Sequence, residues 1–358
     1  MESVYTNKKP TKKKMSRKTS PFEKLTDDSI AKVFSYLTTD ELCAACPGVC
    51  RRWYSITWGT RSLWTQIEVG DSAVDVDKGL RSVLKLLSRD FCGQSKASEA
   101  SCGSNHYLNY SSLKRASDGE TSTSVEIPVE EIVVYSPKNS FTLSDRGLLL
   151  ISRKCTRLKS LILISCPNVT DIGLSDVVSS CHRLTRISCP GCPEIALNIS
   201  RKHARRSLRY LDVSDCPRVN DYSIKTFLRA FGSDLQVFFA RKCLLITDEG
   251  VEALVRFSPQ LRDVSLNECL RVTDAGCREL TKLSSSLRYV SLSKCRQVTD
   301  EGLQYLLSFK PRLRYLNIRG CPLVSDVGTF AQRIMCRQER AACRLRPSPP
   351  THPPICCP

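Results

Sequence analysis

The stretch that decides the fold runs from residue 287 to residue 303 and reads LRYVSLSKCRQVTDEGL. Leu287, Val290 and Leu292 are apolar, and the two-residue spacing of the last two is typical of a strand with one buried face. A cysteine follows at position 295. The phrase from Val298 to Leu303 places Thr-Asp ahead of Gly and an apolar residue, which is typical of a helix N-terminus. The stretch therefore predicts one strand followed by one helix.

The same wording recurs along the chain at intervals of 24 to 27 residues. Segments that fit Leu-x-x-Leu-x-Leu-x-x-Cys, with apolar substitutions, begin at Leu158, Leu184, Leu208, Leu235, Leu261, Leu287 and Leu313. A single strand and helix cannot bury their apolar faces alone, so stacked units must share one continuous core. The pattern predicts an α/β fold, a leucine-rich-repeat solenoid shaped as a horseshoe with a parallel sheet on its concave face.

These repeats are expected to fill residues 125–330. An earlier repeat with an insertion is read from Ile132-x-Val134 followed by the phrase from Ser144 to Leu148. Residues 69–91 are interpreted as a linker helix or a degenerate first repeat, whose strand would include Ile67-x-Val69. Residues 92–124 are rich in Ser, Gly, Asn and Lys, and we expect a disordered insertion there.

The formal net charge of +18 is concentrated at the two ends of the chain. Residues 1–20 carry +6 and are expected to be a disordered basic tail, with a nuclear-import or anion-binding patch at 8–14 as the alternative. Residues 331–358 carry +4 and read as an Arg- and Pro-rich tail without a clear cap for the last repeat. Because more than half of the charge lies in these tails, a protein that coats nucleic acid along its whole length is disfavoured.

The residues that usually carry catalysis or hold metals are sparse. The four histidines are scattered, and no phosphate-binding loop or nucleophile elbow is found. Cys43-x-x-Cys46 and Cys189-x-x-Cys192 are each half of a zinc pattern, but no second pair completes either one, so buried thiols are favoured. We expect no metal, no cofactor, no membrane span and no enzymatic activity of the chain itself.

Residues 21–68 differ from the repeats. Leu25, Ile30, Val33, Phe34 and Leu37 fall at helical spacing, and Thr38 with Glu41 forms a capping-box pattern. All three tryptophans lie within the twelve residues 53–64. A helical segment of about 45 residues is too small to bury so many large apolar side chains, so a partner is expected to cover one face. The alternative is that these side chains pack on the first repeat.

This segment resembles an F-box. The resemblance rests on Leu25-x-x-Asp28-x-Ile30-x-x-Val33-Phe34-Ser35-Tyr36-Leu37, on the run Val49–Trp53 and on Leu63-Trp64. With repeats of the cysteine type behind it, the chain is similar to the F-box and leucine-rich repeat family. Thr26 stands where that family usually has proline.

The resemblance implies a non-catalytic substrate-recognition subunit of an SCF-type E3 ubiquitin ligase. The F-box would bind the Skp adaptor, which carries a cullin and a RING protein, and the concave face would bind a protein substrate. It would act in the cytoplasm, with the nucleus or the centrosome as further locations. A scaffold that binds the adaptor without delivering substrates is one alternative, and an anion or nucleic-acid binder that uses the basic tails is another.

Two sets of contact residues are predicted. The adaptor-binding candidates are Leu25, Ile30, Val33, Phe34, Leu37, Leu42, Val49, Cys50, Trp53, Leu63 and Trp64. The repeat register turns three columns of residues outward on the concave face, and Tyr and Arg are favoured anchors at protein interfaces. The substrate-binding candidates are Tyr210, Phe239, Arg241, Asn267, Tyr289, Tyr315 and Arg319. The alternative is that the tyrosines stack on one another as structure.

Overall fold

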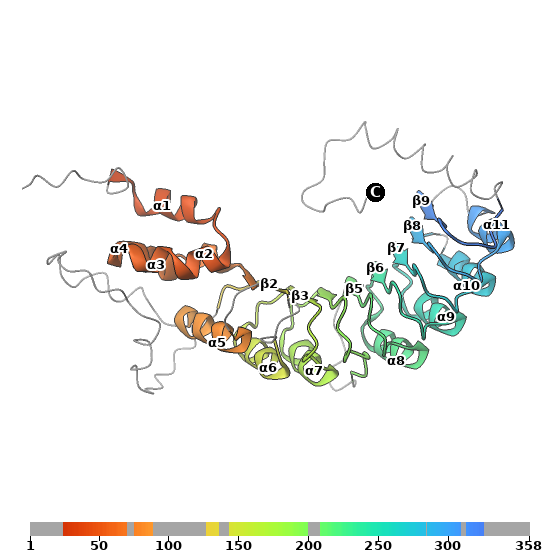
Figure 1. Cartoon of the computed structure of the whole chain (residues 1–358), viewed down its shortest axis with the longest axis horizontal. Coiled ribbons are helices and arrows are strands. Elements are labelled where there is room, and N and C mark those ends of the chain that lie inside the picture. Colours follow the sequence, from red (N-terminus) through yellow and green to blue (C-terminus); the bar gives the residue numbers. More distant parts are fainter. Residues whose placement is uncertain are drawn as a thin grey trace, which may run out of the picture.

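The computed structural model describes residues 24–69, 75–88, 127–135, 143–199, 208–283, 285–308 and 313–325. A group of short helices leads into a curved solenoid of strand–helix units (Figure 1). Nine parallel strands pair in chain order, β1 to β9, and line the concave side, while the helices of the solenoid cover the convex side. The predicted α/β horseshoe is confirmed. The two predicted tails and the insertion at 92–124 lie outside the described residues.

The strands are β1 Gln66–Val69, β2 Glu131–Tyr135, β3 Ser160–Ile164, β4 Arg186–Ser188, β5 Tyr210–Asp212, β6 Val237–Phe239, β7 Asp263–Ser265, β8 Tyr289–Ser291 and β9 Tyr315–Asn317. The helices of the solenoid are α5 Val76–Leu87, α6 Asp145–Lys154, α7 Asp171–Ser180, α8 Asp221–Phe231, α9 Asp248–Phe257, α10 Asp274–Leu280 with the 3-10 turn η5 Thr281–Leu283, and α11 Asp300–Ser308. The N-terminal helices are α1 Asp27–Phe34, α2 Thr39–Ala44, α3 Cys46–Val49, α4 Arg51–Gly59 and the 3-10 turn η2 Arg61–Trp64. Among the described residues, no helix combines the length and the apolar character that a bilayer span requires.

An aspartate at the start of each solenoid helix ties its repeat to the next one. The carboxylate of Asp248 accepts a hydrogen bond from the backbone N–H of Thr273 at 2.9 Å and one from its hydroxyl at 2.7 Å. Thr273 also caps α10, because its Oγ1 accepts from the N–H of Ala275 at 3.1 Å. The same pair of inter-repeat bonds joins Asp145 to Thr170, Asp221 to Thr247 and Asp274 to Thr299. We call this pair of bonds the aspartate clasp.

The clasp also operates where the sequence is irregular. The carboxylate of Asp77 on α5 accepts from the N–H and the hydroxyl of Ser144, so α5 is joined to α6 although 67 residues separate the two side chains. The strands of these two units are joined as well, because β1 pairs in parallel with β2. The unit between β4 and β5 lacks the Thr-Asp-x-Gly phrase and has no helix among its described residues. There the carboxylate of Asp171 accepts from three successive backbone N–H groups, at 196, 197 and 198.

The glycine of the repeated phrase is explained by the carboxylate of the preceding repeat. The N–H of Gly276 donates to Oδ1 of Asp248 at 2.9 Å. A Cβ atom at this position would lie 2.5 Å from the same oxygen, which no ordinary contact allows. A Cβ atom at Gly250 or Gly302 would lie closer still to the carboxylate of Asp221 or Asp274. Gly is therefore required by close approach between repeats.

Each repeat cysteine is buried at the end of its strand and faces the preceding repeat. The thiol of Cys269 donates to the carbonyl oxygen of Ala240 at 3.0 Å, and that of Cys243 donates to Val213 at 3.1 Å. Burial raises the pKa of Cys243 and of Cys295 to about 12, so both stay protonated donors at neutral pH. The cysteines among the described residues are free thiols, and Cys46, Cys189 and Cys192 are buried as the sequence predicted, whereas Cys43 is half-buried. The residue before each repeat cysteine has a positive φ: Ser165, Gly191, Asp215, Lys242, Glu268, Lys294 and Gly320.

The clasp predicts opposite effects of one substitution at two equivalent helix positions. Gly276→Ala should lower the free energy of unfolding by about 1–3 kcal/mol, because the new methyl group collides with the Asp248 carboxylate. Gly79 occupies the same place in α5, but a Cβ atom added there would meet nothing within 4 Å. Gly79→Ala should raise the free energy of unfolding by about 0.5–1 kcal/mol through helix propensity. Urea unfolding followed by circular dichroism measures both, and a shift of the two midpoints in the same direction would contradict the clasp.

Candidate protein-binding surfaces

The N-terminal helices are held together by a small aromatic core. The Phe34 ring meets the edge of Trp53 at a centroid distance of 5.0 Å, which joins α1 to α4. Trp58 stacks on Trp64 at 4.7 Å, and the Trp64 indole donates to the carbonyl oxygen of Thr57 at 2.7 Å. Arg52 adds a polar tie, since its guanidinium bonds the Asp27 carboxylate at 2.8 Å and the backbone oxygen of Leu25.

The two predicted helix starts of this segment are capped by threonine. Thr38 and Glu41 form the predicted capping box, with the Thr38 N–H donating to Glu41 at 2.8 Å. These bonds from Thr38 lower the pKa of Glu41. Thr26 caps α1 by accepting from the N–H of Ser29 at 3.3 Å, with a φ of −70°. Proline adopts that φ as well, so threonine keeps the backbone course and adds a capping oxygen.

The N-terminal helices and the solenoid share one core. η2 leads within two residues into β1, and the N–H of Glu68 on β1 donates to the Thr39 hydroxyl on α2 at 2.9 Å. Trp64 and Ile67 are fully buried in the same apolar cluster as the repeats. Packing on the first repeat, which was the alternative to a partner, therefore accounts for part of the apolar surface of this segment.

The structure corrects the adaptor surface for five of the predicted side chains. Ile30, Phe34, Leu42, Leu63 and Trp64 are buried within the chain. Phe34 is 2% exposed because Trp53, from a helix 17 residues further on, covers its ring. Leu37 and Trp53 are half-buried, and Leu25, Val33, Val49 and Cys50 are exposed. Whether any of them contacts an adaptor stays a prediction.

Three of the exposed members and one further residue are large apolar side chains that face solvent. Among the described residues, four of the ten large apolar side chains that face solvent lie in or beside the N-terminal helices: Leu25, Val33, Tyr36 and Val49. Tyr36 is 78% exposed and was absent from the predicted contact set, although it lies within the quoted motif. Its N–H donates to the carbonyl oxygen of Val33 at 3.1 Å, so these two lie on one turn. We call these four residues the N-terminal apolar surface.

The concave face has the register that the repeat pattern predicts. Tyr289 pairs with Tyr315, and Tyr210 pairs with Val237, so equivalent residues of successive repeats stand side by side. Tyr289 and Tyr315 stack in parallel at 4.6 Å, and Tyr210 meets Phe239 edge to face at 5.8 Å. Each of these four predicted substrate contacts is half-buried, so each packs on a neighbour and still presents an edge to solvent.

The three polar candidates lie beyond the strand ends. Arg241 is ion-paired with Glu268 at 3.4 Å. Asn267 accepts from the Ser291 hydroxyl at 2.6 Å and from the Ser293 N–H at 2.8 Å, so its side chain holds the adjacent loop. Arg319 is exposed at the end of β9. Two of the polar candidates, Arg241 and Asn267, therefore already bind other residues of the chain, whereas the aromatic candidates pack on neighbouring rings or strands.

Two charged residues that the predicted contact set omits shape the middle of the concave face. The guanidinium of Arg186 lies 4.1 Å above the Tyr210 ring. Burial raises the pKa of Tyr210 to about 12, and the nearby Asp212 carboxylate adds to the rise. Burial also raises the pKa of Asp212, although the Ser214 N–H donates to it at 3.0 Å and Arg186 lies close by. The sequence of one repeat does not predict such a contact, because Arg186 and Tyr210 lie on neighbouring strands.

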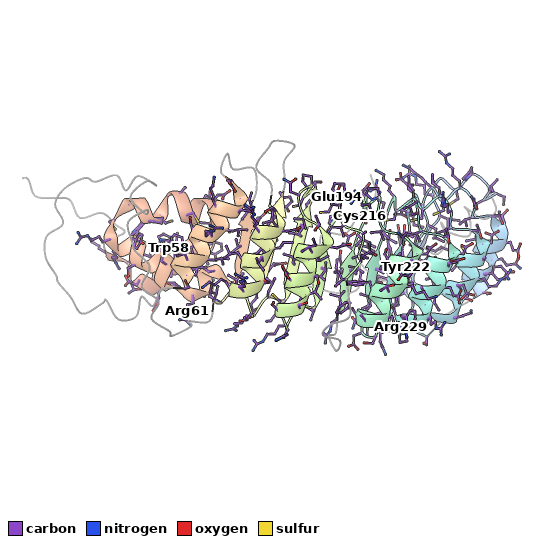
Figure 2. The ribbon with its side chains drawn as sticks, turned by 90° about the horizontal axis from the view of Figure 1, so that it is seen from below. Trp58, Arg61, Glu194, Cys216, Tyr222 and Arg229 are labelled. Atoms are coloured by element: carbon purple, nitrogen blue, oxygen red, sulfur yellow. The ribbon has the colours of Figure 1, made fainter. Side chains whose placement is uncertain are left out.

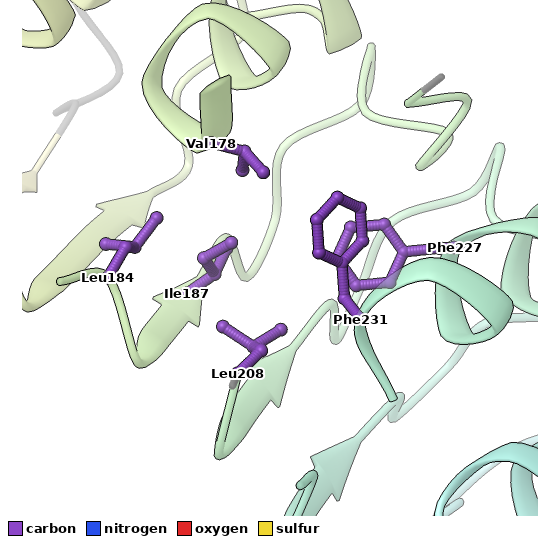
Figure 3. A pocket seen from close by; sticks show the side chains of 6 residues that line it. All are labelled: Val178, Leu184, Ile187, Leu208, Phe227 and Phe231. Carbon is purple, nitrogen blue, oxygen red and sulfur yellow. The ribbon is translucent and has the colours of Figure 1, made fainter. Parts of the chain in front are cut away.

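A small apolar cavity lies in the core and offers no chemistry. Its lining comes from α7, from α8 and from the segment between them that includes β4 (Figure 3): Val178, Leu184, Ile187, Leu208, Phe227 and Phe231. It lies where the unit between β4 and β5 has no helix among its described residues. We interpret it as imperfect packing at the irregular repeat. Within the described ranges, no group of three or more His, Cys, Asp or Glu side chains could hold a metal ion.

The raised pKa of Asp212 predicts a pH-dependent cost. The folded protein binds the Asp212 proton more tightly than the unfolded chain, so this group destabilises the fold at neutral pH. That cost fades as the pH falls through the folded pKa. Asp212→Asn keeps an oxygen for the Ser214 N–H, so its melting temperature should exceed the wild-type value at pH 7 and equal it near about pH 3. A lower melting temperature of the variant at pH 7 would show that the charged contacts outweigh burial.

Comparisons with known proteins agree with this architecture in two segments. The F-box-like family matches residues 27–69, and a Leucine Rich repeat family matches residues 283–307. Among solved structures, a chain in the crystal structure of the Rad7 and Elc1 complex in yeast is similar, with a TM-score of 0.45 and 15% identity. That match covers 85% of this chain and 86% of the other. The chain is an F-box-like segment followed by leucine-rich repeats.

Proposed function

We propose that this chain is the substrate-recognition subunit of an SCF-type E3 ubiquitin ligase. The N-terminal apolar surface binds a Skp-type adaptor, which brings a cullin and a RING protein, and the concave face of the solenoid binds a protein substrate. The observation that carries the proposal is the exposure of four large apolar side chains on an F-box-like segment that is otherwise well packed. Large apolar side chains exposed on a small helical unit are typical of a protein-binding site.

The connection between the two parts suits a receptor. The core runs without a break from Trp64 of the F-box-like segment into Ile67 of β1, and the Glu68–Thr39 hydrogen bond locks β1 to α2. A substrate on the concave face would therefore be held at a fixed distance from the adaptor. In this proposal the chain binds and positions, while the chemistry of ubiquitin transfer belongs to other subunits.

Within the F-box and leucine-rich repeat proteins, we propose the greatest similarity to F-box/LRR-repeat protein 7. Three features support this: the run from Val49 to Tyr54, the segment from Val76 to Leu80, and the wording of the repeats. The first of these includes Arg52, whose bonds to α1 give that run a structural role as well.

Substitutions on the N-terminal apolar surface should separate adaptor binding from folding. Val33→Glu with Tyr36→Ser removes two exposed anchors, which are 46% and 78% exposed, and places a charge in the interface. We expect the affinity for a Skp-type adaptor to fall by at least about thirtyfold, as for loss of a hot spot of about 2–4 kcal/mol. Co-purification and titration calorimetry measure this, with the melting temperature as the folding check.

A matched pair on the outer helices is the control. Ile172 and Tyr222 are 71% and 74% exposed on α7 and α8, and Tyr222 lies on the helical face of the solenoid (Figure 2). Ile172→Glu with Tyr222→Ser should leave adaptor binding unchanged. Equal binding by both double variants and the wild type would refute the proposed adaptor surface. Phe34→Ala is a poor test, because it opens the core beside Trp53. Deletion of 21–68 is also a poor test, because it removes most of β1.

A further inference from the structure

Four arginines stand in one row along the edge at which the concave strands begin. Arg209, Arg262, Arg288 and Arg314 directly precede β5, β7, β8 and β9. The row is continuous in hydrogen bonding, since the N–H of Arg314 donates to the carbonyl oxygen of Arg288 at 2.7 Å and that of Arg288 donates to Arg262 at 2.8 Å. Gln236 links Arg262 to Arg209 in the same way. We call these four residues the arginine row.

The side chains of the arginine row are exposed, and none forms an ion pair with another described residue. The same edge behaves differently near the start of the solenoid. There Glu130 pairs with Lys159 at 2.7 Å and with Arg157 at 3.4 Å, so the positive charge is balanced within the chain. Beyond Lys159 no acidic residue occupies this row among the described residues.

The opposite edge of the concave face shows that charge balance is possible in this fold. Glu268 pairs with Arg241 at 3.4 Å and with Lys294 at 3.5 Å, and Asp215 pairs with Lys242 at 3.4 Å. Three cations of this edge are therefore paired with acids, while the other edge leaves a line of guanidinium groups for solvent. Like charges at neighbouring positions repel, so the arginine row costs the free protein some stability.

An acid and a pair of aromatic rings lie beside the arginine row. Asp263 is half-buried near Arg262 and Arg288, and burial raises its pKa despite their attraction. One half-buried carboxylate cannot balance four guanidinium groups, so most of the row stays uncompensated. Tyr289 and Tyr315 directly follow Arg288 and Arg314, and their stacked rings give the row an aromatic wall on the concave side.

We propose that the arginine row binds an extended acidic segment of the protein partner, carrying carboxylate or phosphoryl groups. This rests on the proposed function, in which the concave face holds the substrate. Guanidinium groups bind both kinds of anion with two parallel hydrogen bonds. Four strand-to-strand steps of about 4.8 Å separate Arg209 from Arg314, or about 19 Å, and an extended peptide of about six residues covers that length. The aromatic wall would accept an apolar side chain next to the acids.

Peptide binding to the full chain tests the proposal. Three fluorescent peptides of one length are compared by anisotropy: one rich in Glu, one with phosphoserine at the same positions, and one with Gln. We expect the anionic peptides alone to bind, and to bind more weakly as salt rises from about 0.05 M to about 0.3 M. Arg262→Gln with Arg288→Gln and Arg314→Gln should weaken that binding by at least about tenfold, since several exposed charge contacts are lost together.

A control variant removes the same charge from the outer helices. Arg153→Gln, Lys225→Gln and Arg229→Gln change exposed residues of α6 and α8, and Arg229 lies on the helical face seen in Figure 2. This variant should bind the anionic peptides like the wild type. Equal losses in both triple variants, or no loss in either, would overturn the proposal. A preference for the Glu or the phosphoserine peptide identifies the source of the anion.

Two further measurements complete the test. A single-stranded DNA of equal charge that binds as tightly as the peptides, with the same dependence on the arginine row, would overturn the proposal in favour of a nucleic-acid site. Capture of the Skp-type adaptor is measured on the same triple variant and should match the wild type. Failure of adaptor capture by the wild type would refute the proposed function, whereas peptide binding that ignores the arginine row refutes this inference alone.

Discussion

The aspartate clasp is the interaction on which the rest of the structure depends. Near the start of each solenoid helix an aspartate carboxylate binds the next repeat, in most cases at the capping residue of the next helix, as Asp248 binds Thr273. Three constraints follow from this one contact. The threonine must cap its own helix and donate to its neighbour, the glycine must leave room for the carboxylate, and the strands must keep one register. Equivalent residues of the concave strands stay side by side because the clasp fixes each helix relative to the next.

Much of the fold could be predicted because one phrase recurs at a nearly constant period. The strands, the helix starts and the buried cysteines all follow from a single repeat read seven times. The role of the aspartate could not be predicted in that way. Asp248 and Thr273 are 25 residues apart. A helix start within one repeat already explains the Thr-Asp-x-Gly phrase, so nothing in it indicates a contact with another repeat. Only the stacked repeats show that the aspartate binds the following repeat, and that the glycine leaves room for the carboxylate of the preceding one.

The candidate surfaces show the same limit. Helical spacing placed Phe34 and Val33 in one predicted contact set. It cannot show which face of α1 packs on the rest of the chain. That face is the one with Phe34, because Trp53 covers its ring. On the concave face, the repeat pattern predicted the register in which equivalent residues such as Tyr289 and Tyr315 pair. It could not show that Glu268 neutralises Arg241, or that Arg288, which lies outside the predicted contact set, has no ion pair among the described residues. Charge pairing across repeats depends on side chains about 26 residues apart, and it decides which cations are available to a partner.

Amide hydrogen exchange in an Asp221→Ala variant tests the clasp most directly, with Lys225→Ala on the same helix as the control. Coupling between nearest neighbours predicts a local effect in a solenoid. Protection should fall most around Thr247 and α9, fall less in α10, and stay at the wild-type level in β3 and α6, which lie on the far side of the irregular repeat. Unchanged protection at Thr247, or an equal loss in every repeat, would contradict the view that these carboxylates hold the solenoid together one step at a time.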